Sequence, residues 1–267
     1  MTTNDHFFRF DKTIVTDGTW AKLPNNARAA FLTIASYLNI KRNCIPGRKR
    51  ISKQAGYLWE KKKVNGKEVI IQNLKSVTVG VDILEKYRLL KRRHIHIKTK
   101  NEHVAYDMFM CKYCFPELTI ENADFFKFYD NLVRGDLTKA EIRKNKKNRF
   151  IATSVWAELL DVAKNLYICM RADSYPYPFR DKKTESPNRQ FEICTASKKK
   201  LKIDSGLSES SYFRALAQLK KCGLVVKLRS EYNNTTANAI YMRLGKIGDQ
   251  KYMENELDEA GEYSIYG

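Results

Sequence analysis

Residues 201–226, LKIDSGLSESSYFRALAQLKKCGLVV, contain a short helical segment, a glycine turn, a second amphipathic helix and the start of a strand. Ser208 precedes the second helical run and is expected to be its N-cap, because a serine oxygen accepts hydrogen bonds from first-turn amides. Gly223 follows the run and is expected at C′, where the backbone often becomes left-handed. This stretch therefore predicts two helices joined by a tight turn and followed by a strand.

An earlier part of the chain repeats this plan. The matching positions are Trp20 with Trp156, residues 51–56 (ISKQAG) with 201–206 (LKIDSG), Val81 with Leu216, and Leu84 with Leu219. The offset between the copies changes because each carries an insert at a different point. Two copies of the order helix, helix, helix, strand, strand favour a duplicated domain, although short amphipathic helices can also match by chance.

The first copy has further local signals. Asn65-Gly66 predicts a type I′ hairpin, and apolar spacing over 74–90 predicts a helix that buries Val77, Val81, Leu84 and Tyr87. Residues 91–100 and 103–110 are expected to pair as a basic hairpin. The aromatic-rich segment 124–133 is expected to be a connecting helix, and the basic run 139–150 a linker.

This order of elements resembles the winged helix-turn-helix family over most of the chain. The resemblance implies a mainly α fold with small β-hairpins (α+β), built as two winged-helix domains in tandem. The expected organisation is a first domain at 1–110, a connecting helix and basic linker at 111–153, a second domain at 154–248, and a flexible acidic tail at 249–267. In that family the third helix enters the major groove of DNA, and the hairpin wing contacts a neighbouring groove or the backbone.

Composition favours an anionic partner. The chain has 267 residues, 43% of them hydrophobic, and a net charge of +19. Both large segments are basic and only the tail is acidic, so nucleic acid is the first partner to consider. The N-terminus lacks a signal-peptide core, no apolar run approaches the roughly 20 residues that span a bilayer, and the six cysteines are scattered. A soluble, cytoplasmic protein without membrane contact and with free thiols is expected.

The expected DNA contacts follow from the placement of polar and basic side chains. Ser, Arg and Gln on a third helix can reach base edges, whereas Lys and Arg bind phosphate. The candidates of the second copy are Ser208, Ser210, Ser211, Arg214 and Gln218, with Lys198, Lys199, Lys200 and Arg229. Those of the first copy are Lys75, Ser76, Thr78, Arg48, Lys49 and Arg50, with Lys91, Arg92, Arg93 and Lys98 on the wing. Val79 and Asp82 are poor DNA contacts, so the first copy is expected to rely on its wing. The basic runs are equally compatible with solvated surface.

The N-terminal segments 8–39 and 45–56 (IPGRKRISKQAG) resemble plasmid and phage replication initiators, or replisome organisers, in layout. The resemblance implies a sequence-specific binder of double-stranded DNA that recognises origin repeats and recruits a host helicase or helicase loader, or itself as a dimer. No catalysis and no cofactor are predicted. A transcriptional repressor would use the same surface, and a three-helix core can also serve protein–protein contacts.

Two small motifs leave other readings open. His94-Ile95-His96 is similar to the metal motif of HUH nickases, because alternation places both imidazoles on one strand face. Tyr87 lies upstream of it, whereas that family places its nucleophilic tyrosine downstream. Cys111 and Cys114 have zinc-ligand spacing, which His94, His96 or His103 could complete. A phosphate-binding GxxxxGK[ST] loop is absent, which argues against an ATPase.

Overall fold

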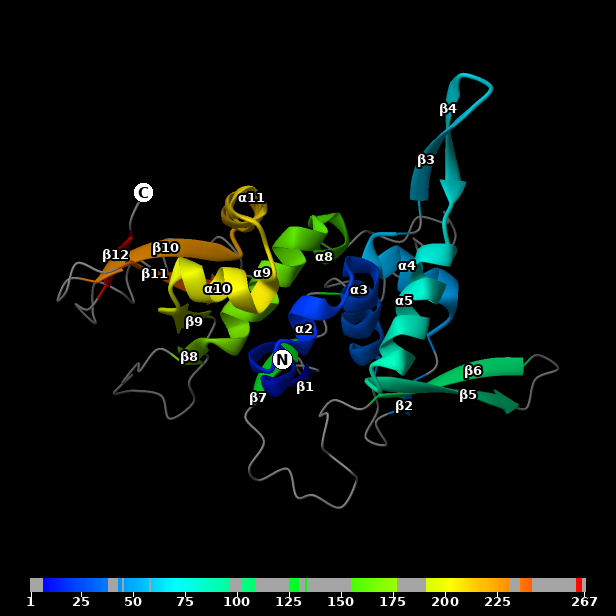
Figure 1. Ribbon diagram of the computed structural model, residues 1–267, viewed down its shortest axis with the longest axis horizontal. Helices are drawn as coiled ribbons and strands as arrows, with labels where there is room; N and C mark the ends of the chain where they lie inside the picture. The colour runs from blue at the N-terminus through cyan, green and yellow to red at the C-terminus, as the bar shows by residue number, and fades with distance from the viewer. Residues whose placement is uncertain are drawn as a thin grey trace, which may run out of the picture. The chain divides into compact units, whose positions relative to one another are not determined.

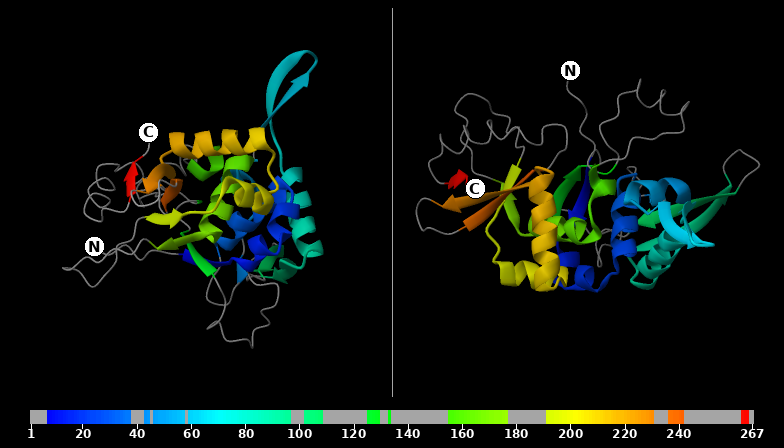
Figure 2. Two further views of the ribbon diagram at one scale, coloured as in Figure 1. Left: turned by 60° about the vertical axis from the view of Figure 1, so that its left-hand side comes forward. Right: turned by 90° about the horizontal axis from the view of Figure 1, so that it is seen from above.

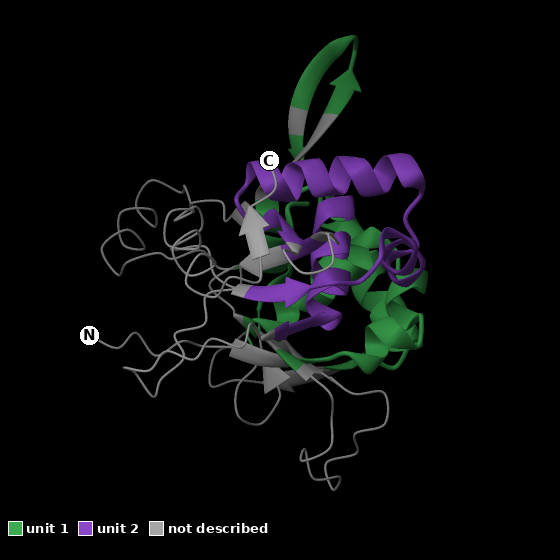
Figure 3. Ribbon diagram, turned by 90° about the vertical axis from the view of Figure 1, so that its left-hand side faces the viewer, with its two compact units in different colours: residues 1–161 green, residues 162–267 purple. Residues whose placement is uncertain are grey.

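The computed structural model describes residues 7–37, 43–44, 46–57, 59–96, 102–108, 125–129, 133, 155–176, 191–230, 236–241 and 263–265. Its elements are helices and small antiparallel sheets, so the predicted α+β class is confirmed. Figure 1 shows these helices and strands along the chain. The chain divides into two compact units, unit 1 at residues 1–161 and unit 2 at residues 162–267 (Figure 3). Both units contain fully buried apolar side chains of their own.

Three helices form the centre of unit 1. The described helices of this unit are α1 (Thr13–Thr16), α2 (Thr19–Lys22), α3 (Asn25–Ala35), α4 (Arg48–Ala55), α5 (Lys75–Lys86) and α8 (Val155–Glu158). Phe31, Ile51 and Leu84, one from each of α3, α4 and α5, have no exposed surface. A Cβ at Gly80 of α5 would lie 2.6 Å from the backbone oxygen of Asn26. This glycine therefore allows α5 to pack closely against the start of α3.

Two hairpins extend from these helices. Strands β2 (Asn43–Cys44), β5 (Leu90–His96) and β6 (Glu102–Met108) form an antiparallel sheet in the order β2-β6-β5, which confirms the predicted basic hairpin. Strands β3 (Trp59–Val64) and β4 (Lys67–Gln72) form a second hairpin between α4 and α5. Its turn has positive φ at Asn65 (50°) and Gly66 (78°), as the type I′ prediction requires. Figures 1 and 2 show this hairpin projecting away from α4 and α5.

The expectation of a connecting helix at 124–133 is wrong for the aromatic run. Residues Phe125–Tyr129 form strand β7, which pairs with β1 (Phe7–Asp11). Phe126 and Phe128 alternate along the strand and are buried, which is the period-two pattern of a strand. The ring of Phe126 stacks on Phe10 with centroids 4.9 Å apart, and the ring of Phe128 meets Trp156 edge-on at 5.5 Å. Aromatic packing thus holds β7 in the core of unit 1.

Unit 2 repeats the order of elements. Its described helices are α9 (Asp161–Ala172, with Asp161 the last residue of unit 1), α10 (Lys198–Ser205) and α11 (Glu209–Lys221). Its described strands are β8 (Ser174–Pro176), β9 (Phe191–Cys194), β10 (Val225–Ser230), β11 (Thr236–Tyr241) and β12 (Tyr263–Ile265). The sheet order is β12-β10-β11-β9-β8, so β9-β11-β10 matches β2-β6-β5 of unit 1. Strand β12 belongs to the segment expected to be a flexible tail, and it pairs with β10.

Corresponding helices of the two units also end in the same backbone conformation. Helix α4 ends at Gly56 and α10 at Gly206, both with left-handed φ (86° and 65°). In each, the glycine N–H and the next N–H donate back to carbonyls of the last turn, the Schellman pattern. Helices α5 and α11 end in the same pattern at Arg88 (φ 57°) and Gly223 (φ 70°). These matched ends support the residue alignment drawn from the sequence.

Candidate nucleic-acid interface

Helix α11 is fixed at both ends and along one face. The Ser208 oxygen accepts a hydrogen bond from the Ser211 amide at 3.4 Å, so the N-cap prediction is confirmed, and the left-handed Gly223 confirms the predicted C′ residue. Tyr212, Ala215 and Leu219 are buried in unit 2. Ser208 and Ser211 hydroxyls also bond to each other. Both serines therefore shape the start of the helix, and the outer face is left for contacts.

The outer face of α11 carries a continuous exposed row. Its members are Ser210, Phe213, Arg214, Ala217 and Lys221, whereas the predicted Gln218 is half-buried beside the row. Arg214 makes no ion pair with any residue that the structure describes. Phe213, Ala217 and Lys221 were not predicted, although the helical period places Ala217 and Lys221 opposite Tyr212 and Leu219. The Phe213 ring lies between the two faces and meets the Tyr212 ring edge-on, with centroids 5.7 Å apart. The Phe213 side chain is 52% exposed, which is unusual for a large aromatic group.

Two of the three lysines in the first turn of α10 form ion pairs with acidic residues. Lys198 Nζ lies 2.8 Å from a Glu209 carboxylate oxygen and 5.3 Å from the centre of the Phe213 ring. Hydrogen bonds from Lys198 and Lys202 lower the pKa of Glu209 from 4.5 to about 2. Lys200 Nζ lies 2.6 Å from Asp173 and 2.5 Å from Asp204. Within the described part of unit 2, Lys199 is the lysine of this run without an ion pair.

Helix α4 of unit 1 opens on the matching basic triplet. Arg48, Lys49 and Arg50 are all exposed, and the first turn contains no acidic residue. Three cations at a helix N-terminus oppose the helix dipole, so helix stability does not explain them. The Arg50 guanidinium lies 5.9 Å from the Tyr37 ring centre. Arg48 and Lys49 form no ion pair with another described residue, and they leave a concentrated positive charge at this end.

The start of α5 is built from short polar bonds. The Ser76 amide donates to the Asn73 side chain at 3.2 Å, the Asn73 amide group donates to the Ser76 hydroxyl at 3.1 Å, and the Asn26 amide group donates to the Ser76 carbonyl at 2.9 Å. The Thr78 hydroxyl donates to the Leu74 carbonyl of its own helix. The predicted contacts Ser76 and Thr78 thus help to hold the helix, while Lys75 is exposed.

The basic residues predicted on the wing differ in their surroundings. Arg92 donates to Glu85 through its backbone and guanidinium and to Asp82 at 2.7 Å, whereas Lys91 is exposed. The Arg93 backbone lies in β5, but its side chain and all of Lys98 lie outside the described residues. Arg229 is exposed on β10. Tyr87, expected in the core, is 36% exposed, because α5 ends at Lys86 and the chain turns at Arg88.

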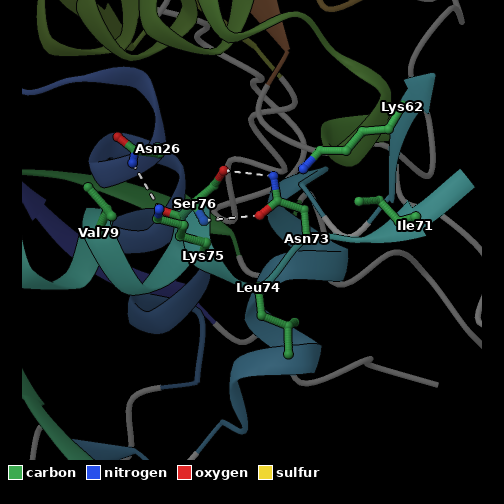
Figure 4. Close-up of a pocket in the computed structure, with 8 residues that line it drawn as sticks. All are labelled: Asn26, Lys62, Ile71, Asn73, Leu74, Lys75, Ser76 and Val79. Carbon is green, nitrogen blue, oxygen red and sulfur yellow. Dashed lines mark hydrogen bonds between the residues drawn. The ribbon is translucent and has the colours of Figure 1, made fainter. Parts of the chain in front are cut away.

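An open groove lies between the β3–β4 hairpin and the start of α5 (Figure 4). Its volume is about 580 Å³. The lining residues are Asn26, Lys62, Ile71, Asn73, Leu74, Lys75, Ser76 and Val79. Figure 4 shows the Lys62 side chain reaching from the hairpin toward Asn73. Two lysines and three neutral polar side chains line the groove without an acidic residue among them, which suits an anion.

The metal motifs are only partly described. His94 and His96 lie on one face of β5 by strand alternation, but their side chains, Cys111 and Cys114 lie outside the described residues. Among the residues that are described, no three His, Cys, Asp or Glu side chains gather into a metal site. Cys169, Cys194 and Cys222 are free thiols, and burial raises the pKa of Cys194 to about 12.

Comparison with known proteins gives no assignment: no family model, curated protein or solved structure matches this chain. Across the described ranges, every helix is too short or too polar to cross a bilayer.

Proposed function

We propose that the two units are winged helix-turn-helix domains in tandem and that the chain is a non-enzymatic, sequence-specific binder of double-stranded DNA. The single observation that carries this proposal is the duplicated basic triplet, at 48–50 and 198–200, in the first turns of α4 and α10. In helix-turn-helix proteins the first helix of the pair crosses the DNA backbone, and the second reads base edges. This position supports phosphate contact by the triplets, with Lys199 as the lysine of the second triplet that has no ion pair among the described residues.

The outer face of α11 supports base reading by unit 2. Arg214 is exposed at the middle of the helix and flanked on that face by the small residues Ser210 and Ala217. An arginine that reaches the major groove can bond the O6 and N7 atoms of one guanine. The exposed Phe213 ring is an apolar surface of the kind that contacts thymine methyl groups. Ser210 and Lys221 extend the same face toward the two ends of the helix.

The cellular role follows from the sequence resemblance to plasmid and phage replication initiators. Two readers in one chain suit iterated or inverted repeats, because binding of one unit raises the effective concentration of the other at its site. The proposed protein binds origin repeats of a plasmid, phage or other mobile element and recruits a host helicase or its loader. A transcriptional regulator is the second candidate, since an operator would be read through the same exposed face of α11.

Selection from a random-sequence duplex library, performed with the full chain at two salt concentrations and with Mg²⁺ present, tests the proposal. The expected result is a recovered motif with two half-sites on intact DNA. Binding that is steeply salt-dependent but recovers no motif would contradict sequence specificity. Strand cleavage would contradict the non-enzymatic assignment. Iterated copies of the motif beside an origin would favour the initiator, and a single promoter copy the regulator.

A further inference from the structure

The β3–β4 hairpin is an insertion at one defined place in unit 1. Unit 2 connects α10 to α11 through Gly206, Leu207 and Ser208 alone, whereas unit 1 places the whole hairpin between α4 and α5. The hairpin is therefore inserted in the turn between the two helices of the proposed helix-turn-helix. An arm inserted at this turn starts beside the N-terminal end of the second helix, the end that contacts base edges in this class of motif.

The distal part of the β3–β4 hairpin is exposed on both faces. Every residue from 62 to 69 is exposed, and Val64 and Val69 are 50% and 37% exposed. The strand register places Lys62 opposite Val69 and Val64 opposite Lys67, so lysines and valines share one face. A two-stranded hairpin in water is marginally stable alone. A projecting arm with this face is suited to lie against a partner.

The base of the same face forms a wall of the groove. Lys62 and Ile71 come from the hairpin, and Lys75 and Val79 come from α5 on the other side. The side-chain amides of Asn26 and Asn73 contribute hydrogen-bonding groups between these walls. Cations stand on two opposed walls, and none of the described lining residues is acidic. This charge matches a chain of phosphates better than a neutral or cationic ligand.

The outer face of α5 is poorly suited to reading bases. Its exposed positions Val79 and Asp82 correspond to Arg214 and Ala217 of α11, and the Asp82 carboxylate is bonded by Arg92. The exposed cations of unit 1 instead include those of the groove, the hairpin and the α4 triplet. In its described residues, unit 1 therefore offers positive charge on its surface, and the outer face of α5 lacks the base-reading groups that α11 carries.

We propose that the groove between the β3–β4 hairpin and α5 binds the phosphodiester backbone of duplex DNA, with Lys62 and Lys75 contacting phosphates from opposite walls. The hairpin acts as an arm along the duplex, and unit 1 supplies sequence-independent affinity while unit 2 supplies specificity. This inference rests on the proposed DNA binding, and it assigns different tasks to the two units.

The test uses the full chain and a random-sequence duplex, titrated at several salt concentrations. Lys62→Ala and Lys75→Ala should each lower the slope of log affinity against log salt by about 1, and the double variant by about 2. The selected duplex should lose affinity by the same factor as the random one. Lys22→Ala, which removes an exposed lysine at the end of α2, is the charge-matched control and should leave the slope unchanged.

Outcomes separate the two proposals. An unchanged slope in both groove variants, with normal wild-type binding, would overturn the groove inference alone. An equal drop in the Lys22→Ala control would also overturn it, because the effect would then reflect overall charge. Absence of wild-type binding would overturn DNA binding itself. As a second measurement, p-benzoylphenylalanine in place of Val64 should crosslink to the duplex, while the same group in place of Lys22 should not; the reverse result counts against the arm.

Discussion

Arg92 of β5 is bonded to Glu85 of α5 through both its backbone and its side chain. The Arg92 amide donates to one Glu85 carboxylate oxygen at 2.7 Å, and its Nε donates to the other at 2.9 Å. Although burial opposes ionisation, the bonds from Arg92 lower the pKa of Glu85 overall. The pair ties the wing strand to the preceding helix, so Arg92 has a structural role, whereas the neighbouring Lys91 is exposed.

Arg92→Ala and Lys91→Ala should therefore have opposite signatures. Loss of Arg92 is expected to destabilise unit 1 by about 1 kcal/mol, since the bonds are charged but partly exposed, and to leave the salt slope of DNA binding unchanged. Loss of Lys91 should leave stability unchanged and lower the slope by about 1. Urea unfolding followed by tryptophan fluorescence reports on unit 1 alone, because all three tryptophans (20, 59 and 156) belong to it. If Arg92→Ala also lowered the salt slope of DNA binding, Arg92 would have to be counted among the phosphate contacts.

Arg214→Ala tests base reading by α11. The variant should lose discrimination at one base pair of the selected site, at a cost of about 1–3 kcal/mol, and should bind random duplex almost as well as the wild type. Lys199→Ala is the comparison, because a phosphate contact should weaken binding to all sequences and lower the salt slope by about 1. Competition titrations with single-base variants of the site distinguish the two. Uniform weakening in Arg214→Ala would exclude it as a base reader.

Local signals predicted the parts of the fold that depend on neighbouring residues. Ser208 and Gly223 cap α11, and Asn65-Gly66 turns the β3–β4 hairpin, because each effect acts within a few residues. Strand β7 escaped prediction, since its partner β1 lies more than a hundred residues earlier in the chain. Residues 124–133 contain no local signal that identifies β1 as a partner. Without a known partner strand, a short aromatic-rich segment can be assigned to a helix.

The charge of the candidate site could be predicted from the sequence, but the ion pairs between residues far apart in the chain could not. The lysine run 198–200 signals positive charge, but the sequence does not reveal that Lys200 meets Asp173, 27 residues away. Similarly, Asp82 read as a poor DNA contact, and its pairing with Arg92 became visible only in the folded unit. Phe213 is exposed beside Arg214 on α11, but an aromatic side chain in an amphipathic helix is ordinarily buried, so its exposure is visible only in the folded unit. Charge runs predict a partner class, and the fold decides which charges are available.

Glu209 should titrate far below an ordinary glutamate. Its carboxylate accepts hydrogen bonds from Lys198 and Lys202, which hold its pKa at about 2. A depressed folded-state pKa contributes stability above pH 4.5, and this contribution is lost as the pH falls toward 2. Carbon-13 NMR of labelled glutamate should show the low midpoint in the native chain. The double variant Lys198→Ala/Lys202→Ala should move the midpoint up toward 4.5. A native midpoint near 4.5 would show that these lysines do not hold the carboxylate in solution.

Arg88 and Gly223 occupy matching positions after α5 and α11, with φ of 57° and 70°. Left-handed backbone costs an L-residue about 1–2 kcal/mol, whereas glycine adopts it freely at some entropic cost. Arg88→Gly should therefore stabilise unit 1 by about 0.5–1 kcal/mol, measured by tryptophan fluorescence during urea unfolding. Arg88 is exposed, so its removal sacrifices no packing.

The reciprocal change at the other copy supplies the matched comparison. Gly223→Ala should destabilise unit 2 by about 1 kcal/mol, followed by circular dichroism because this unit has no tryptophan. The opposite signs are the decisive feature, since both changes act on the same backbone conformation at the same step of a repeated plan. If Arg88→Gly lowered stability, the arginine side chain would have to make a contact that outweighs the relief of its left-handed backbone.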